Sequence, residues 1–147
     1  MDDDLEVDLD RVALEHAIGV LTPLRQHRQA SAERARRQIE HALHALHEQL
    51  RTSTESMNQE RDNQKLRRQQ LSDTHLQKSM ALSDIDRWHE KERRMLDRLA
   101  QIRQSITQLR ERIELQQHQL QQAQQDVKAR QRAVEKLACM SESLYEN

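Results

Sequence analysis

The chain is poor in the residues that build turns, loops and compact cores. Its 147 residues include one glycine, one proline, one cysteine, one tryptophan, one tyrosine and no phenylalanine. A single glycine excludes a glycine-rich phosphate-binding loop, and a single cysteine excludes a disulfide within the chain. An aromatic content of 1% and a mean hydropathy of -1.07 leave too little bulky apolar surface for a globular core. The sequence contains no alternating apolar run bounded by turn residues, so it predicts no strand.

Charge is balanced over the chain but unevenly distributed. The 24 basic and 25 acidic residues give a formal net charge of -1, which directs the chain neither to nucleic acid nor to anionic lipid. No basic segment precedes an apolar stretch, and no run approaches about eighteen apolar residues. We therefore expect a cytoplasmic protein without membrane insertion. The first ten residues contain six acids and no base, at Asp2, Asp3, Asp4, Glu6, Asp8 and Asp10.

An apolar stripe with the period of a coiled coil occupies the second half of the chain. Alternating steps of three and four from Ile85 to Leu144 give eighteen positions, of which fourteen are apolar. A repeat averaging 3.5 residues keeps one narrow stripe facing a partner helix, so the pattern predicts a long coiled-coil seam. The positions are Ile85, Trp88, Glu92, Met95, Leu99, Ile102, Ile106, Leu109, Ile113, Gln116, Leu120, Ala123, Val127, Arg130, Val134, Leu137, Ser141 and Leu144.

A second stripe lies in the first half, clearest at Ile39, Leu43, Leu46, Leu50 and Met57. It weakens into a polar run at 58–64, where we expect the helix to continue on propensity and local charge pairs. The predicted fold is all-α: a long antiparallel two-helix coiled-coil hairpin with a short acidic helical extension at its N-terminus.

Turn signals near residue 20 predict the boundary of that extension. Gly19 suits the end of an acidic amphipathic helix, and Thr22 before Pro23 suits the N-cap and first position of the next helix. The sequence thus predicts an extension at 1–21 and a hairpin at 22–147. A continuous helix kinked at Pro23 is the alternative.

Within the hairpin we expect a helix at 22–77, a turn at about 78–83 and a helix at 84–145. Ser83 can cap the second helix, and Asp84 suits its positively polarised N-terminal end.

Self-pairing as a parallel dimer is the competing arrangement of the seam. It would place Arg98 against Arg103 between strands, and the neighbouring flanking positions Lys91, Arg110 and Arg112 offer no compensating acids. Each exposed pair is worth about half a kcal/mol, so the charges favour the hairpin without deciding the matter. We expect a monomer in the free state.

The sequence offers no arrangement that predicts catalysis or cofactor binding. His41, His44 and His47 cannot converge on one metal ion, because the third lies roughly 240° round the helix from the first. Cys139 has no flanking motif and is expected to be a structural thiol near the seam. We predict a non-enzymatic protein with no metal and no cofactor.

A few residues suggest contacts with partner proteins. Arg34 belongs to a basic cluster that favours a solvated face or an acidic protein surface over nucleic acid. Trp88 is the only tryptophan, so it either fills the hairpin near its turn or anchors another protein. The polar seam residues Glu92, Gln116 and Arg130 either set the register or contact a further surface.

The chain resembles the small coiled-coil stalk proteins of type III secretion, which include the FliJ, YscO and HrpO types. Residues Leu24-Arg25-Gln26-His27-Arg28, followed by alanines, are similar to the basic first helix of that family. Leu82-Ser83-Asp84-Ile85-Asp86-Arg87-Trp88 resembles its polar turn and tryptophan-containing second helix, and Ala133-Val134-Glu135-Lys136-Leu137 resembles its ending. The resemblance covers roughly 22–140, and the acidic extension departs from it.

This resemblance implies a central stalk in the pore of a hexameric secretion ATPase. The stalk would connect the ATPase with the export-gate membrane protein at the cytoplasmic face of the inner membrane, in a flagellar or a virulence system. Family members are also linked to the escort of export chaperones. The alternatives are a generic coiled-coil scaffold or tether, and a stator or chaperone-like adaptor. The candidate partner-binding residues are Arg25, Arg28, Arg34, Trp88, Arg130 and Lys136.

Overall fold

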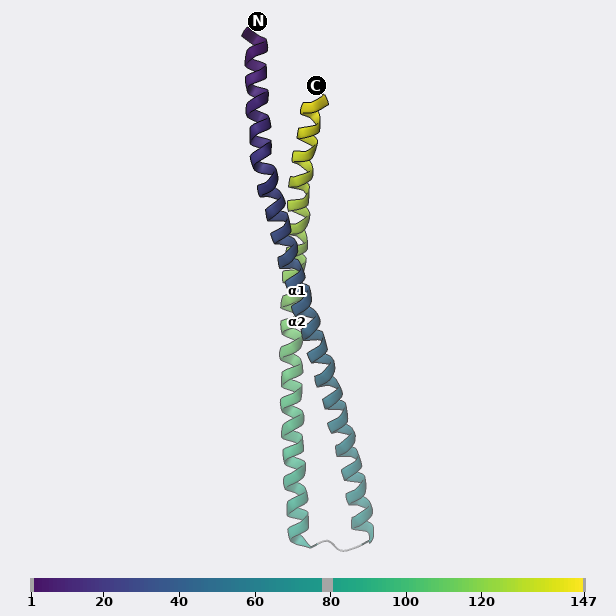
Figure 1. Ribbon diagram of the computed structural model, residues 1–147. Helices are drawn as coiled ribbons and strands as arrows, with labels where there is room; N and C mark the ends of the chain where they lie inside the picture. Colours follow the sequence, from purple (N-terminus) through teal and green to yellow (C-terminus); the bar gives the residue numbers. More distant parts are fainter. Residues whose placement is uncertain (1, 78–80, 147) are drawn as a thin grey trace. The chain divides into compact units, whose positions relative to one another are not determined.

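The residues that the structure describes form two long helices. The computed structural model describes the backbone of residues 2–77 and 81–146, and the side chains of residues 9–74 and 81–146. Helix α1 spans Asp2–Gln77 and helix α2 spans Leu82–Glu146, and no strand occurs among the described residues (Figure 1). The predicted all-α helical hairpin is confirmed.

The predicted seam of α2 is confirmed position by position. All eighteen seam residues are buried or half-buried, and among the other residues of α2 only Ala133 is not exposed. The four polar members, Glu92, Gln116, Arg130 and Ser141, are half-buried. A strict 3.5-residue period keeps the stripe on one side of the helix. The alternating three-and-four spacing therefore predicts the burial of all eighteen seam residues. The most buried members are Met95, Leu99, Ile106, Leu109, Ile113 and Leu137.

Helix α1 presents a matching but more polar seam. Leu46 is buried, and the other four positions named from the sequence are half-buried. The helix continues through the polar run at 58–64, where only Glu60 and Gln64 are half-buried. Polar residues at these positions supply less apolar burial, so packing is weaker there than around Leu46.

The chain divides into two compact units, each containing a segment of both helices. The first unit comprises Met1–Ala42 and Gln116–Asn147. In this unit the Arg11 side chain donates a hydrogen bond to the carbonyl oxygen of Leu144, and Arg25 Nη1 donates to that of Ala133 at 2.9 Å. From Arg11 to Arg25 on α1, the bonded residue on α2 moves back from Leu144 to Ala133. The two segments are therefore antiparallel.

The second unit, Leu43–Leu115, holds the main apolar cluster. Leu46 packs with Leu109 and Ile113, and the half-buried Leu43 and Leu50 pack against them. Ion pairs continue the same antiparallel pairing away from this cluster, from Arg98 to Glu60 at 3.9 Å and from Arg68 to Glu92 at 2.8 Å.

The structure places no helix boundary at residue 21. Helix α1 runs through Pro23 without interruption, so the predicted helix at 22–77 begins too late and the continuous alternative holds. The Thr22 hydroxyl donates to the Ile18 carbonyl at 2.7 Å instead of capping a new helix. Proline has no backbone N–H, so the Gly19 carbonyl lacks its usual helical donor, but one lost bond does not end a helix of this length.

The start of α2 differs from the expected cap. The helix begins at Leu82, and the Ala81 carbonyl accepts hydrogen bonds from the backbone N–H groups of Asp84 at 3.0 Å and Ile85 at 3.2 Å. Ala81, not Ser83, therefore occupies the N-cap position, and Ser83 lies in the first turn. Asp84 also lies in that turn, as expected. The predicted turn at about 78–83 falls partly on residues 78–80, outside the described residues.

Gly19 offers a direct test of the helix through this region. A Cβ built on Gly19 meets no atom within 4 Å, and no described residue requires a positive φ. Replacing Gly19 with alanine should therefore raise the free energy of unfolding by about 0.5–1 kcal/mol, because alanine has the higher helix propensity. Urea unfolding followed by circular dichroism at 222 nm measures the change. A destabilised variant would contradict a continuous helix at this position.

Candidate partner-binding surfaces

Four of the six candidate residues line one groove in the first unit. Arg25 and Arg28 come from α1, and Arg130 and Lys136 come from α2, with Ala133 between the last two. Arg25 and Arg28 lie three apart on α1 and so share one face. Arg130 and Lys136 lie six apart on α2, and both line the groove together with Ala133. This cationic groove has a volume of about 350 Å³.

The cationic groove contains few counter-charges. Arg130 Nε lies 3.4 Å from Asp126 Oδ1, and Arg25 is held by its hydrogen bond to the Ala133 carbonyl, which carries no formal charge. Arg28 and Lys136 are exposed and form no ion pair within the described part of the chain. The groove can therefore accept carboxylates of another protein with little competition from the chain itself.

The remaining two candidates lie elsewhere. Arg34 is exposed, does not line the cationic groove and forms no ion pair among the described side chains. Trp88 belongs to the second unit. The sequence suggested the six candidates for separate reasons, whereas the antiparallel pairing brings four of them together at matching positions on the two helices.

Trp88 lines two adjoining hollows of the second unit. It is half-buried, and its ring meets that of His89 edge to face with centroids 5.2 Å apart. The hollows have volumes of about 560 and 480 Å³ and share Arg68, Leu71, Trp88 and Glu92 in their walls. Trp88 thus lies beside Arg68 and Leu71 of α1 and remains partly exposed, so packing and anchoring are compatible.

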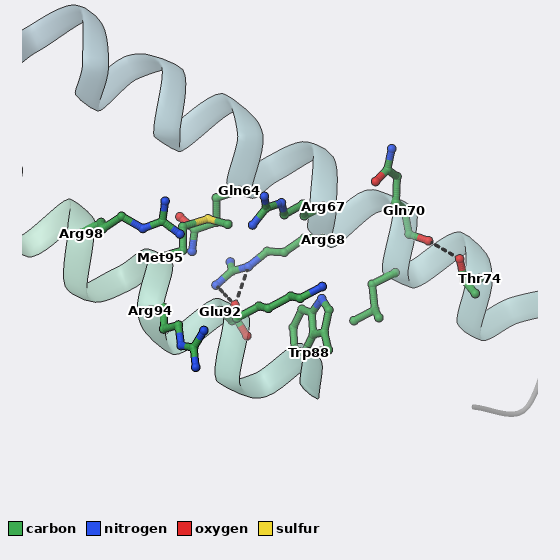
Figure 2. Close-up of a pocket in the computed structure, with 12 residues that line it drawn as sticks. Gln64, Arg67, Arg68, Gln70, Thr74, Trp88, Glu92, Arg94, Met95 and Arg98 are labelled. Carbon is green, nitrogen blue, oxygen red and sulfur yellow. Dashed lines mark hydrogen bonds and ion pairs between the residues drawn. The ribbon is translucent and has the colours of Figure 1, made fainter. Parts of the chain in front are cut away.

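The larger hollow, which we call the Trp88 groove, is rich in cations (Figure 2). Arg68 reaches across from α1 and donates to Glu92 Oε1 through Nε at 3.0 Å and Nη2 at 2.8 Å. Glu92 is the one carboxylate in its wall. The five basic residues in its wall are Arg67, Arg68, Lys91, Arg94 and Arg98.

Arg67 and Arg68 of α1 share this wall with Lys91, Arg94 and Arg98 of α2. Pairing Arg68 with Glu92 sets residues 64–74 of α1 beside residues 88–98 of α2. Counting outward from the turn along both helices would have suggested this grouping.

Cys139, expected near the seam, is exposed.

One exposed ion pair on α1 has a measurable electrostatic signature. Hydrogen bonding to Arg51, together with its positive charge, holds the pKa of Glu48 below its ordinary value of 4.5. The shortest separation between the two side chains, from Arg51 Nη2 to Glu48 Oε2, is 3.0 Å. A lowered carboxyl pKa means that the pair favours the helix above the unfolded value and loses this contribution as the pH falls below 4.5.

Replacing Arg51 with glutamine should return the pKa of Glu48 toward 4.5, because both the hydrogen bond and the charge are removed. Titration of the Glu48 carboxyl carbon by nuclear magnetic resonance measures this pKa in the two proteins. An unchanged titration midpoint would show that Arg51 does not hold the carboxylate.

The described residues contain no group of three or more histidine, cysteine or acidic side chains placed to hold a metal ion. None of the described helical segments is apolar over a sufficient length to cross a membrane. In comparisons with known proteins, the chain matches no family model, no curated protein and no solved structure.

Proposed function

We propose that the chain is a non-enzymatic stalk of a bacterial type III secretion system. One part of the hairpin lies in the pore of the hexameric secretion ATPase, promotes its assembly and activity, and links it to the export gate at the cytoplasmic face of the inner membrane. The family resemblance of residues 22–140 suggests this role. Escort of export chaperones is part of the same proposal.

The cationic groove is the observation that best supports a protein-binding role. Two helices contribute Arg25, Arg28, Arg130 and Lys136 to one surface, with Asp126 paired to only one of them. Acidic loops lining the pore of an ATPase ring would complement this charge, and such complementarity speeds encounter and fixes orientation. The ATPase supplies all of the catalysis in this proposal.

A two-helix stalk can act on a ring because it lacks the symmetry of the ring. A hairpin in a sixfold pore presents different side chains to the six subunit interfaces, so it favours different states at different interfaces. Such differential contact is what couples a bound partner to the activity of an enzyme.

Titration of the secretion ATPase from the same bacterium tests the proposal. Adding the full chain should raise the rate of ATP hydrolysis and shift the ATPase from monomer toward hexamer in sedimentation velocity. At 0.15 M salt the chain itself should sediment as a monomer. A stable dimer that leaves the ATPase unchanged would favour a scaffold or tether, and binding without stimulation would favour an adaptor; either result rejects the stalk.

A further inference from the structure

We infer that the acidic N-terminal segment of one copy of this chain binds the Trp88 groove of a second copy, head to tail. We call residues 2–10 the acidic leader. The inference goes beyond the proposed function and does not depend on it.

The groove supplies one half of the contact. Its wall has five cations and one carboxylate, and three of the five already face an acid: Arg68 at Glu92, Arg94 at Glu90 and Arg98 at Glu60. Arg67 and Lys91 form no ion pair among the described side chains. Leu71 and Trp88 add apolar surface to the same wall. A fitting ligand therefore carries several carboxylates and at least one bulky apolar side chain.

The acidic leader has this chemistry. It contains six acids and no base in the sequence, and its backbone belongs to α1 from Asp2 onward. At its end Leu9 is 67% exposed, and Val12 just beyond it is 61% exposed. These apolar side chains are not covered within their own unit, so a contact with Trp88 would remove apolar surface from water as well as pair charges.

In the head-to-tail arrangement the leader of one copy meets the groove of the next, so the contact is heterologous. One leader and one groove then remain unoccupied at the two ends of the assembly, which can grow past the dimer. The contact joins charged groups of opposite sign and must weaken with salt, since the screening length falls from about 30 Å at 0.01 M to about 3 Å at 1 M. At 0.15 M it is expected to be largely dissociated, which agrees with a monomer in the ATPase assay.

Sedimentation velocity of the full chain tests the inference over a range of protein and salt concentrations. At about 0.01 M salt the weight-average mass should rise with protein concentration beyond that of a dimer, and at about 1 M it should return to the 17.5 kDa of one chain. The emission of Trp88, the only tryptophan, should shift to shorter wavelength as the mass rises.

Charge reversal on each side provides the sharper test. The groove variant Arg67→Glu/Lys91→Glu and the leader variant Asp4→Lys/Asp8→Lys should each remain monomeric at low salt. An equimolar mixture of the two should associate again, because the unaltered leader of the groove variant meets the unaltered groove of the leader variant. Circular dichroism shows whether each variant keeps the helix content of the original chain.

The control variant Arg110→Glu/Arg112→Glu changes the charge by the same amount at exposed positions outside the groove, and it should associate like the original chain. A single monomeric species at every low-salt concentration would overturn the inference, as would association that survives the groove reversal. A concentration-independent emission shift would indicate contact within one molecule and would also reject it. A chain that stays monomeric yet stimulates the ATPase rejects this inference alone.

Discussion

Replacing Leu109 with alanine should lower the free energy of unfolding by about 2–3 kcal/mol, a large loss of stability for one substitution. Leu109 is 8% exposed and packs with Leu46 and Ile113 in the main apolar cluster. Truncation removes buried methyl groups and leaves a space between two helices that can relax only partly. A seam between two helices is open at its sides, which places the estimate at the lower end of the usual range for leucine-to-alanine substitutions.

Leu115→Ala is the matched control. Leu115 lies on the same helix and in the same unit but is 60% exposed, so its truncation should change the unfolding free energy by less than about 0.5 kcal/mol. Helix propensity changes equally in the two variants, and the difference between them isolates packing. Urea unfolding followed at 222 nm gives both values. Equal losses would show that Leu109 is not packed against α1.

The paired reversal Arg25→Glu/Arg130→Glu should have the largest effect on activity. It converts attraction for acidic loops into repulsion on both helices of the cationic groove. We expect the concentration for half-maximal stimulation of the ATPase to rise about tenfold, which corresponds to about 1.4 kcal/mol of binding free energy. The shift should shrink as salt is added, because both side chains are partly exposed.

Arg132→Glu tests whether the weaker stimulation of the ATPase depends on the position of the reversed charge and not on the change of charge alone. Arg132 is exposed on α2 two residues from Arg130, and it does not line the groove. It should leave stimulation within about twofold of the original chain. Circular dichroism must show equal helix content in all variants, since Arg25 also donates to the Ala133 carbonyl. Equal effects of Arg132→Glu and of the paired reversal would argue against the groove as the contact surface.

The period of the sequence was sufficient to predict the helices and every seam position of α2. Burial in a coiled coil follows from spacing alone, so even Glu92 and Arg130 were placed correctly by counting. The boundary at residue 21 was wrong because Gly19 and Pro23 were interpreted locally. Both residues weaken a helix, but the packing of the surrounding segment, including buried Ile18, outweighs one missing hydrogen bond.

Surfaces formed by both helices were harder to predict than the seam. Arg25 and Arg130 were named separately, and only the pairing of α1 with α2 shows that they line one groove. Arg67 and Lys91 lie 24 residues apart in the chain, and they share a wall of the Trp88 groove only because the two helices pair. Such groupings depend on the register between the two helices, and the periodicity of each helix by itself does not determine that register.

The narrowness of the seam has a consequence for how this chain can evolve. Along α2 the seam and Ala133 are the only positions not exposed to water, so most substitutions elsewhere on that helix leave the interhelical packing intact. Descendants of one ancestor can therefore diverge at most sites while retaining the three-and-four spacing. Evolutionary relationship among such proteins is therefore better judged by the spacing of their apolar residues, and by the cations that the two helices bring to one groove, than by sequence identity.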